Sequence, residues 1–271
     1  MTSPLLKVNE LSITFKGNAI VQNISFSLNK QEVISLVGES GSGKSVTALS
    51  ILGLLPPGGK TSGSIEFDST EILGLPSKKL RSIRGQEIGM IFQEPMSALN
   101  PVFTVGHQIE ETLLSHQRIS RLKARSITLD VMKEVGLPPS RFGNYPHEFS
   151  GGMLQRVLIA IALICEPRIL IADEPTTALD TATSMQVMQL ITSLKEKRKM
   201  SVLLISHDLD LVSKFSDVTC VLRRGKIVES GASLGILQKP KHPYTQALVA
   251  CKPSFHKGLE RLPTLQKAME K

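Results

Sequence analysis

An eight-residue stretch near the N-terminus, Gly38-Glu-Ser-Gly41-Ser-Gly43-Lys44-Ser45, has the residue types and spacing that bind phosphate. It fits the pattern GxxxxGK[ST], in which the glycines let backbone N–H groups converge on phosphate oxygens. Lys44 can reach the β- and γ-phosphates of a nucleotide, and the Ser45 hydroxyl can ligate Mg²⁺. The flanking residues predict a strand before this loop and a helix after it, and a helix N-terminus favours negative charge. We therefore predict a nucleotide phosphate site.

Two adjacent carboxylates, Asp173 and Glu174, follow the apolar run Ile169–Ala172. A buried parallel strand normally avoids charge, so these carboxylates need a purpose. In a phosphate-loop protein, a carboxylate at the end of a neighbouring strand can hold Mg²⁺, usually through water, and we assign this role to Asp173. Glu174 is then placed to polarise the water that attacks the γ-phosphate. Without the phosphate loop, Asp-Glu-Pro after a strand would be more typical of a helix cap.

A third segment that suits phosphate is Ser150-Gly151-Gly152-Met153, directly before a predicted helix. Ser150 can act as N-cap and as a hydrogen-bond donor, and the two glycines permit close backbone approach to a phosphate. Taken singly, Ser-Gly-Gly is usually just a cap and a turn. Its place between the phosphate loop and Asp173 favours a second anion-binding helix N-terminus.

The elements that must position these segments follow from the spacing of apolar residues and from turn signals. Short apolar runs predict strands over residues 8–15, 20–28, 32–37, 64–67, 88–92, 169–172 and 202–205, and a hairpin over 218–222 and 226–228. Helical spacing predicts helices over 46–55, within 104–136, over 153–164 and 181–197, and near 244–249. Strands that alternate with helices predict a parallel sheet covered on both faces.

Composition and hydropathy exclude several classes of protein. Of the 271 residues, 41% are hydrophobic and 21% charged, which is typical of a folded globular chain and not of a disordered one. The longest apolar run, Val157 to Cys165, is far shorter than the roughly 18 residues that a membrane-spanning helix needs. The N-terminal segment has neither a basic lead nor a long apolar core, so we expect no signal peptide and a cytosolic location.

The cysteines and the net charge indicate a function less specifically than the motifs do. Cys165, Cys220 and Cys251 lie far apart and form no CxxC pair, which predicts buried free thiols, not a zinc site or a disulfide framework. The net charge of +8 would suit nucleic acid, an anionic membrane surface or a phosphate-bearing ligand, and charge alone does not choose among these. The basic clusters Lys195–Lys199 and Arg223–Lys226 are more typical of a solvated helix face and a turn than of a nucleic-acid patch.

The order of the motifs resembles that of the ATP-binding cassette family: the phosphate loop, Gln93, Ser150-Gly-Gly, Asp173-Glu174, Ala178-Leu179-Asp180 and His207. The resemblance covers residues 8 to about 249. Segments 38–47, 90–101, 149–156, 173–180 and 242–248 are similar to nucleotide-binding subunits of the oligopeptide, dipeptide and nickel importer branch. The common family signature begins with Leu and has Gln after the glycines, where this chain has Phe149 and Met153. Met at that position looks normal for this branch.

The resemblance implies a role for each matched residue. Gln93 would contact Mg²⁺ or the attacking water and link the site to a transmembrane partner. His207 would hydrogen-bond the γ-phosphate and help to hold Glu174 and water in place. Phe15 would stack on adenine, although a core phenylalanine in a strand is nearly as typical. Asp180 would lie at a dimer seam, the alternative being the N-cap of the next helix.

These roles define three sets of residues. The implied catalytic residues are Glu174 as general base, His207, Gln93 and Lys44. The implied Mg²⁺ ligands are Ser45, Gln93 and Asp173. The implied ATP contacts are Phe15, Gly38, Ser40, Gly41, Ser42, Gly43, Lys44, Ser45, Val46, Ser150, Gly151, Gly152, Met153 and Asp180.

The resemblance also implies an architecture. We expect an α/β fold with a P-loop NTPase (RecA-like) core that contains a parallel sheet, an N-terminal antiparallel β subdomain and an inserted helical subdomain. The core would comprise residues 1–93 and 166–235, and the helical subdomain with the signature motif would comprise residues 94–165. Residues 236–271 would form a C-terminal tail.

The partners implied by the resemblance are those of a peptide importer, with nickel or metal-chelate import as the alternative. The chain would form a head-to-tail dimer with a second, homologous ATPase, usually a different chain, so we expect a heterodimer. Two transmembrane permease subunits and an extracytoplasmic solute-binding protein would complete the assembly, with this chain peripheral at the cytoplasmic face of the inner membrane.

Two other classes stay open at this point. The net charge of +8 suggests one alternative, a soluble cassette ATPase that acts on nucleic acid or ribosomes. Such proteins usually carry two cassettes or a long coiled-coil insert, whereas this chain shows one phosphate loop and no sustained heptads, so we expect no nucleic-acid partner. A regulatory subunit that does not hydrolyse ATP is disfavoured, because Glu174 and His207 are both present.

Overall fold

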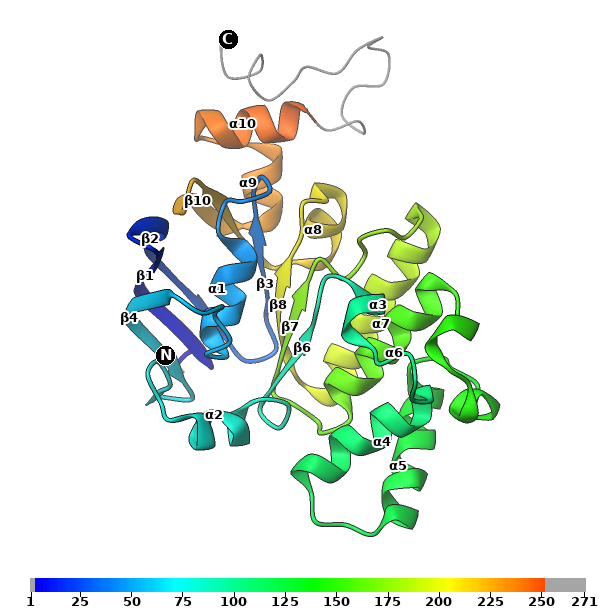
Figure 1. The fold of residues 1–271 in the computed structure, drawn as a ribbon. Coiled ribbons are helices and arrows are strands. Elements are labelled where there is room, and N and C mark those ends of the chain that lie inside the picture. Colours follow the sequence, from blue (N-terminus) through cyan, green and yellow to red (C-terminus); the bar gives the residue numbers. More distant parts are fainter. Residues whose placement is uncertain (1–2, 252–271) are drawn as a thin grey trace. The chain divides into compact units, whose positions relative to one another are not determined.

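The computed structural model describes residues 3–251, which form two compact units (Figure 1). Of the described residues, 3–74 and 203–251 form unit 1, and Leu75–Val202 forms unit 2. The division on the return to unit 1 falls within strand β8 (Ser201–Ile205). The expected core, helical subdomain and tail stay predictions, and residues 252–271 of that tail lie outside the described residues.

Unit 1 begins with a four-stranded antiparallel sheet in the order β2-β1-β4-β5, which confirms the antiparallel subdomain expected near the N-terminus. Its strands are β1 (Leu6–Phe15), β2 (Asn18–Leu28), β4 (Gly59–Phe67) and β5 (Thr70–Glu71). Strand β4 begins earlier than the predicted residue 64. Its first half is polar and shows no alternation, but Gly59 pairs with Phe15, so the hydrogen-bond ladder to β1 defines the strand.

The second sheet of unit 1 places four strands in the order β10-β9-β3-β8. They are β3 (Val33–Val37), β9 (Val218–Arg223), β10 (Lys226–Ala232) and the end of β8. Strands β3 and β9 are parallel, and β9 and β10 form the predicted antiparallel hairpin. Every residue of β3 is buried, as expected for a strand covered on both faces.

Within residues 3–251, unit 1 contains four helices: α1 (Lys44–Ile51), α8 (Leu209–Phe215), α9 (Ser233–Gln238) and α10 (Pro243–Ala250). Helices α1 and α10 match predicted segments. Helix α9 was not among the predicted helices, although it buries Ile236 and Leu237. Helices α8 and α9 span fewer than two full turns each, which is too short to show a helical period in the sequence.

Unit 2 contains the parallel pair β6 (Ile88–Ile91) and β7 (Ile169–Asp173) and most of the longer helices. The helices are α2 (Ser77–Ile83), α3 (Pro95–Ala98), α4 (Val105–His116), α5 (Arg121–Glu134), α6 (Gly151–Leu163) and α7 (Thr181–Arg198), with 3₁₀ turns η1 (Pro139–Gly143) and η2 (Pro146–Glu148). Helices α4 and α5 account for the helical region predicted within 104–136. Both begin at the N-cap that their sequence provides, Thr104 and Ser120.

The structure bears on the expectations about membrane-spanning helices and about the cysteines. Within residues 3–251, no helix is both long and apolar enough to cross a membrane. All three cysteines are free, but only Cys165 and Cys220 are buried, whereas Cys251 is half-buried. Burial raises the pKa of the Cys165 thiol to about 11 and that of Cys220 to about 12, so both are protonated near neutral pH.

The packing of α4 and α5 depends on the ring of Phe142, which is buried in unit 2. Arg125 of α5 covers one side of this ring, with its guanidinium carbon 3.3 Å from the ring centroid. Gly106 of α4 lies against the ring so closely that a Cβ there would be 2.2 Å from Phe142 Cγ. A side chain at position 106 would therefore push α4 away from η1.

We predict that Gly106→Ala lowers the free energy of unfolding by about 1–3 kcal/mol, because the added methyl overpacks a filled site. Gly143→Ala is the matched control in the same unit, since a Cβ at Gly143 would meet no atom within 4 Å. The control should change the free energy of unfolding by less than about 0.5 kcal/mol. Urea unfolding of the two variants checks this, and equal effects would contradict the assigned role of Phe142.

Candidate nucleotide-binding site

The phosphate loop follows the fully buried strand β3 and leads into α1, as the sequence predicted. Its first residue, Gly38, has a φ of 153°, and a Cβ there would lie 2.2 Å from the carbonyl oxygen of Leu222 in β9. No other residue type fits this approach without moving the backbone. Strand β9 thus determines where the loop leaves the sheet.

The ammonium of Lys44 is held inside this loop. The Lys44 side chain is only 5% exposed, and its Nζ donates to the carbonyl oxygens of Gly38 and Glu39, each at 2.8 Å. The hydroxyl of Ser42 is also buried and has no hydrogen-bond partner among the described residues. A buried cation, a buried hydroxyl without a partner and a helix N-terminus with no acidic residue in its first turn fit an anionic ligand.

The other loop residues of the predicted contact set surround this cation. Ser40 and Gly41 are exposed, and Ser45 and Val46 are half-buried. Gly43 is the N-cap residue of α1. The loop therefore keeps an open outer face above a buried lysine, which is the arrangement that a phosphate group requires.

His207 and Phe15 also belong to unit 1. His207 is exposed and follows β8, where the Ser206 N–H donates to the carbonyl oxygen of Leu36 in β3 at 3.3 Å. His207 and the phosphate loop therefore start at the ends of neighbouring strands. Phe15 ends β1, half-buried, with its ring against the backbone of Gly59. The adenine contact assigned to Phe15 stays a prediction.

In unit 2 the parallel strands β6 and β7 bring Gln93 and Glu174 together. Asp173 is the last residue of β7 and is buried, and Glu174 follows it with a φ of 47°. Gln93 Nε2 donates to Glu174 Oε2 at 3.0 Å, and the Thr177 hydroxyl donates to the same oxygen at 2.9 Å. The carboxylate of Glu174 is thus oriented by two donors. Sequence analysis missed Thr177, although its spacing of three residues from Glu174 is a usable signal.

Ser150 and Asp180 both cap helices in unit 2, as predicted for Ser150 and as the alternative given for Asp180, whose place at a dimer seam stays a prediction. Ser150 Oγ accepts from the Met153 N–H at 3.4 Å, and Asp180 Oδ1 accepts from the Thr183 N–H at 3.0 Å. Hydrogen bonds from the hydroxyl of Thr183 and then from its N–H hold the pKa of Asp180 below its ordinary value.

These two capped helix ends border one pocket of about 350 Å³. The pocket is lined by Ser150, Gly151, Gly152, Met153, Arg156, Ala178, Leu179, Asp180, Thr183 and Gln186. Thr183 connects its two sides, because a Cβ at Gly152 would lie 2.7 Å from the Thr183 methyl group. The predicted residues Ser150–Met153 and Asp180 therefore share one surface, and the structure adds Thr183, Arg156 and Gln186 to it.

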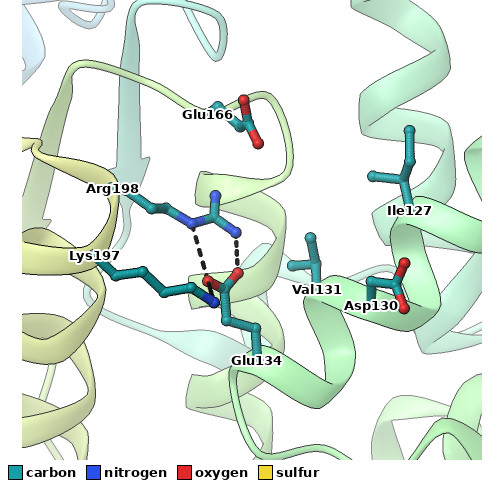
Figure 2. A pocket seen from close by; sticks show the side chains of 7 residues that line it. All are labelled: Ile127, Asp130, Val131, Glu134, Glu166, Lys197 and Arg198. Atoms are coloured by element: carbon teal, nitrogen blue, oxygen red, sulfur yellow. Dashed lines mark hydrogen bonds and ion pairs between the residues drawn. The ribbon is translucent and has the colours of Figure 1, made fainter.

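A second cavity in unit 2, of about 560 Å³, lies beside an ion-pair cluster (Figure 2). It is lined by Ile127, Asp130, Val131, Glu134, Glu166, Lys197 and Arg198. Arg198 pairs with Glu134 and donates to the Leu163 carbonyl at 2.5 Å, and Lys197 Nζ lies 2.8 Å from Glu134 Oε1. Arg198 is thus largely buried, so the expectation that Lys195–Lys199 is simply a solvated face was wrong for this residue.

The charge of Glu134 depends on these two partners. Burial alone would raise the pKa of Glu134, but the hydrogen bonds and charges of Arg198 and Lys197 outweigh burial and lower it. The cluster ties the end of α5 to the ends of α6 and α7, and its three charged side chains pair with one another. It is a structural element of unit 2.

The fold and these groups are typical of a phosphate-loop nucleotide-binding protein with an inserted set of helices. Comparison with known proteins then identifies the family. Residues 21–177 match the family model described as ABC transporter, and residues 228–271 match that of the oligopeptide/dipeptide transporter C-terminal region. The chain belongs to the ABC transporter family, as its motifs predicted.

Individual relatives agree with this assignment. The chain is 46% identical to the dipeptide transport ATP-binding protein DppD of Haemophilus influenzae, over 97% of this chain and 82% of that protein. It is 50% identical to the peptidoglycan transport ATP-binding protein YejF of Agrobacterium fabrum, over 93% of this chain and 48% of that one. The dimeric post-hydrolysis structure of the ATP-binding cassette MJ0796 with ADP and phosphate is similar, with a TM-score of 0.75 and 29% identity over 84% of this chain and 98% of that one.

For the ion-pair cluster we predict a pH-dependent effect of Glu134→Gln. At pH 7 the variant should lose about 1–3 kcal/mol of unfolding free energy, because Arg198 loses a charged partner in a partly buried site. Folding lowers the pKa of Glu134, so its contribution is present above the ordinary value of 4.5 and is lost as the pH falls through the lower folded-state value.

Urea unfolding of wild type and variant between pH 7 and pH 3 measures this difference. Asp130→Asn is the control, because Asp130 lines the same cavity but pairs with Lys133 at the exposed surface, 3.6 Å away. The control should change the unfolding free energy by less than about 1 kcal/mol. A Glu134→Gln effect that stays constant across this pH range would contradict the assigned charge of Glu134.

Proposed function

We propose that the chain is the ATP-hydrolysing subunit of an importer that takes up peptides through separate membrane permease subunits. The match of residues 228–271 to the oligopeptide/dipeptide transporter C-terminal region carries the proposal. The 46% identity to a dipeptide transport ATP-binding protein supports it. The residues singled out above are assigned to ATP binding and hydrolysis, and none of them is assigned to peptide recognition.

Nucleotide binding is assigned to the phosphate loop. The backbone N–H groups of the loop and the ammonium of Lys44 hold the phosphates, and Lys44 exchanges the carbonyls of Gly38 and Glu39 for phosphate oxygens. The oxygens and amide of Ser45, Asp173 and Gln93 would hold Mg²⁺, which usually binds through one or two protein ligands, water and phosphates. When bound, Mg²⁺ neutralises charge on the phosphates.

Hydrolysis is assigned to Glu174 as general base. Its carboxylate takes a proton from the attacking water, and the donors from Gln93 and Thr177 hold it in one orientation. His207 donates a hydrogen bond to the γ-phosphate, and Lys44 stabilises the charge that develops there. Phe15 stacks on the adenine.

The Ser150–Asp180 pocket is assigned to the γ-phosphate of ATP in a second, homologous cassette. Ser150–Met153 would cover that nucleotide in a head-to-tail dimer, and Asp180 would lie at the seam. The pocket supports this, because it is open, polar and built on two helix N-termini. We further propose that the second cassette is a different chain.

The contact with the membrane subunits is assigned to exposed apolar side chains of unit 2. Phe92, Met96, Val102, Phe103 and Tyr145 are all exposed, which is unusual for so many large apolar residues in one part of a fold. The Val105 N–H donates to the Asn144 carbonyl at 2.8 Å, so the segments around residues 103 and 145 are neighbours. Gln93 lies at the start of this surface, and it would link permease movement to Glu174. With this contact, the chain would lie at the cytoplasmic face of the inner membrane.

The proposal is tested by purifying the tagged chain with its partners from membranes of its source cell. Two multispan permease subunits, a second cassette ATPase and a solute-binding protein are expected. ATP hydrolysis by this complex should rise when the binding protein carries a peptide and should not rise with the empty binding protein. Nickel as the stimulating ligand would contradict the peptide assignment, and ribosomes or nucleic acid in place of permeases would contradict transport.

We predict that Glu174→Gln lowers kcat for ATP at least about 100-fold while ATP binding is retained, because the amide cannot accept the proton from water. The measurement is steady-state hydrolysis together with the ATP dissociation constant. A stable dimer with trapped ATP is expected. Undiminished hydrolysis would remove Glu174 from its role.

Lys44→Ala should weaken ATP binding, whereas Glu174→Gln affects hydrolysis. The variant loses the cation that holds the phosphates, so the ATP dissociation constant should rise at least about tenfold, which corresponds to one charged hydrogen bond. Isothermal titration of ATP into the full chain measures it. Normal affinity in this variant would contradict the assignment of the phosphate loop.

A further inference from the structure

The C-terminal region of the chain contacts the phosphate loop directly. Tyr244, in the first turn of α10, is fully buried, and its hydroxyl oxygen accepts a hydrogen bond from the Glu39 N–H at 3.1 Å. Glu39 is the second residue of the phosphate loop. Both residues belong to unit 1, although 205 positions separate them in sequence.

The Glu39 peptide is thereby held from two sides. Its N–H donates to Tyr244, and the carbonyl oxygen of the same residue accepts from Lys44 Nζ at 2.8 Å. The preceding residue, Gly38, is fixed by its close approach to the Leu222 carbonyl. When Lys44 turns to a phosphate, Tyr244 remains as a contact that keeps this part of the loop in place.

The phenol ring has little freedom to move. Its burial is complete, and the guanidinium carbon of Arg223 lies 5.0 Å from the ring centroid. Burial raises the pKa of Tyr244 to about 12, against the opposing effect of the Glu39 N–H. The hydroxyl therefore stays protonated and neutral near pH 7.

The start of α10 is anchored by Glu229 of β10. The two oxygens of its carboxylate accept from the backbone N–H groups of Lys241 at 2.8 Å and His242 at 3.0 Å. His242 Nδ1 in turn accepts from the Tyr244 N–H at 3.1 Å, which caps the helix. Glu229 thus fixes the turn that places Tyr244 against the phosphate loop.

We propose that Tyr244 is a positioning residue for the phosphate loop, and that the C-terminal region sets the affinity for ATP through the Glu39 peptide. This rests on the proposed binding of ATP at the loop. Glu229 acts in the same chain of contacts, one step further from the nucleotide. The C-terminal segment is then part of the nucleotide site and not only a peripheral addition to the fold.

Tyr244→Phe tests the proposal because it removes only the hydroxyl and keeps the buried ring. The ATP dissociation constant of the full chain, measured by isothermal titration, should rise about two- to tenfold, the range for one lost hydrogen bond. The KM for ATP should rise by the same factor, with kcat changed less than about twofold. An unchanged dissociation constant would overturn the proposal.

Ser233→Ala is the matched control. Ser233 is buried in unit 1 and shares a 2.8 Å hydrogen bond with Thr219, which in turn bonds to Ser35 of β3 and not to the phosphate loop. This variant should lower the unfolding temperature without nucleotide and leave the ATP dissociation constant unchanged. An equal rise in both variants would mean that general loss of stability explains the effect, and it would also overturn the proposal.

A double-mutant cycle with Glu229→Ala tests the chain of contacts. Glu229→Ala should also raise the ATP dissociation constant, and adding Tyr244→Phe to it should raise the constant no further, because both changes break the same connection. Fully additive effects would overturn the role of Glu229. If wild type itself does not bind ATP, the proposed function fails instead, so the two failures are distinguishable.

Discussion

A buried ammonium group constrains the arrangement of unit 1. Lys44 begins α1, directly after the loop that follows the fully buried strand β3, and carbonyls of this loop hold its charge away from water. A buried cation needs compensation, and the loop provides it in a form that a phosphate can replace. The loop can adopt this shape because Gly38 approaches the Leu222 carbonyl, which ties the site to β9. Strand β9 thus fixes the start of the proposed nucleotide site, although none of its residues carries a motif.

In unit 2, a candidate functional group is likewise held in place by neighbouring protein groups. Two parallel strands end at the same edge, so Gln93 and Glu174 meet there and Thr177 completes the orientation of the carboxylate. Two helix N-termini, capped by Ser150 and Asp180, then form a separate polar pocket. The residues that we assign to phosphate binding lie in unit 1, and the proposed general base Glu174 and the Ser150–Met153 segment lie in unit 2.

The sequence predicted what depends on local chemistry and missed what depends on distant contacts. The phosphate loop, the strand before it and the caps at Ser150 and Asp180 follow from short segments, so motif and spacing were sufficient. Helix α9 was too short to show a period, and the early start of β4 depended on pairing with β1. The contact of Tyr244 with Glu39 and the burial of Arg198 beside Glu134 join residues far apart in sequence. A single sequence contains no signal for such pairs.

The most direct test of the central claim is a crystal structure of the full chain with Mg²⁺ and an ATP analogue that cannot be hydrolysed. We predict that Lys44 Nζ leaves the carbonyls of Gly38 and Glu39 and lies about 3 Å from β- and γ-phosphate oxygens. The hydroxyl of Ser42, which has no partner among the described residues, should then face the nucleotide. A nucleotide bound elsewhere, with Lys44 still on the two carbonyls, would contradict the account.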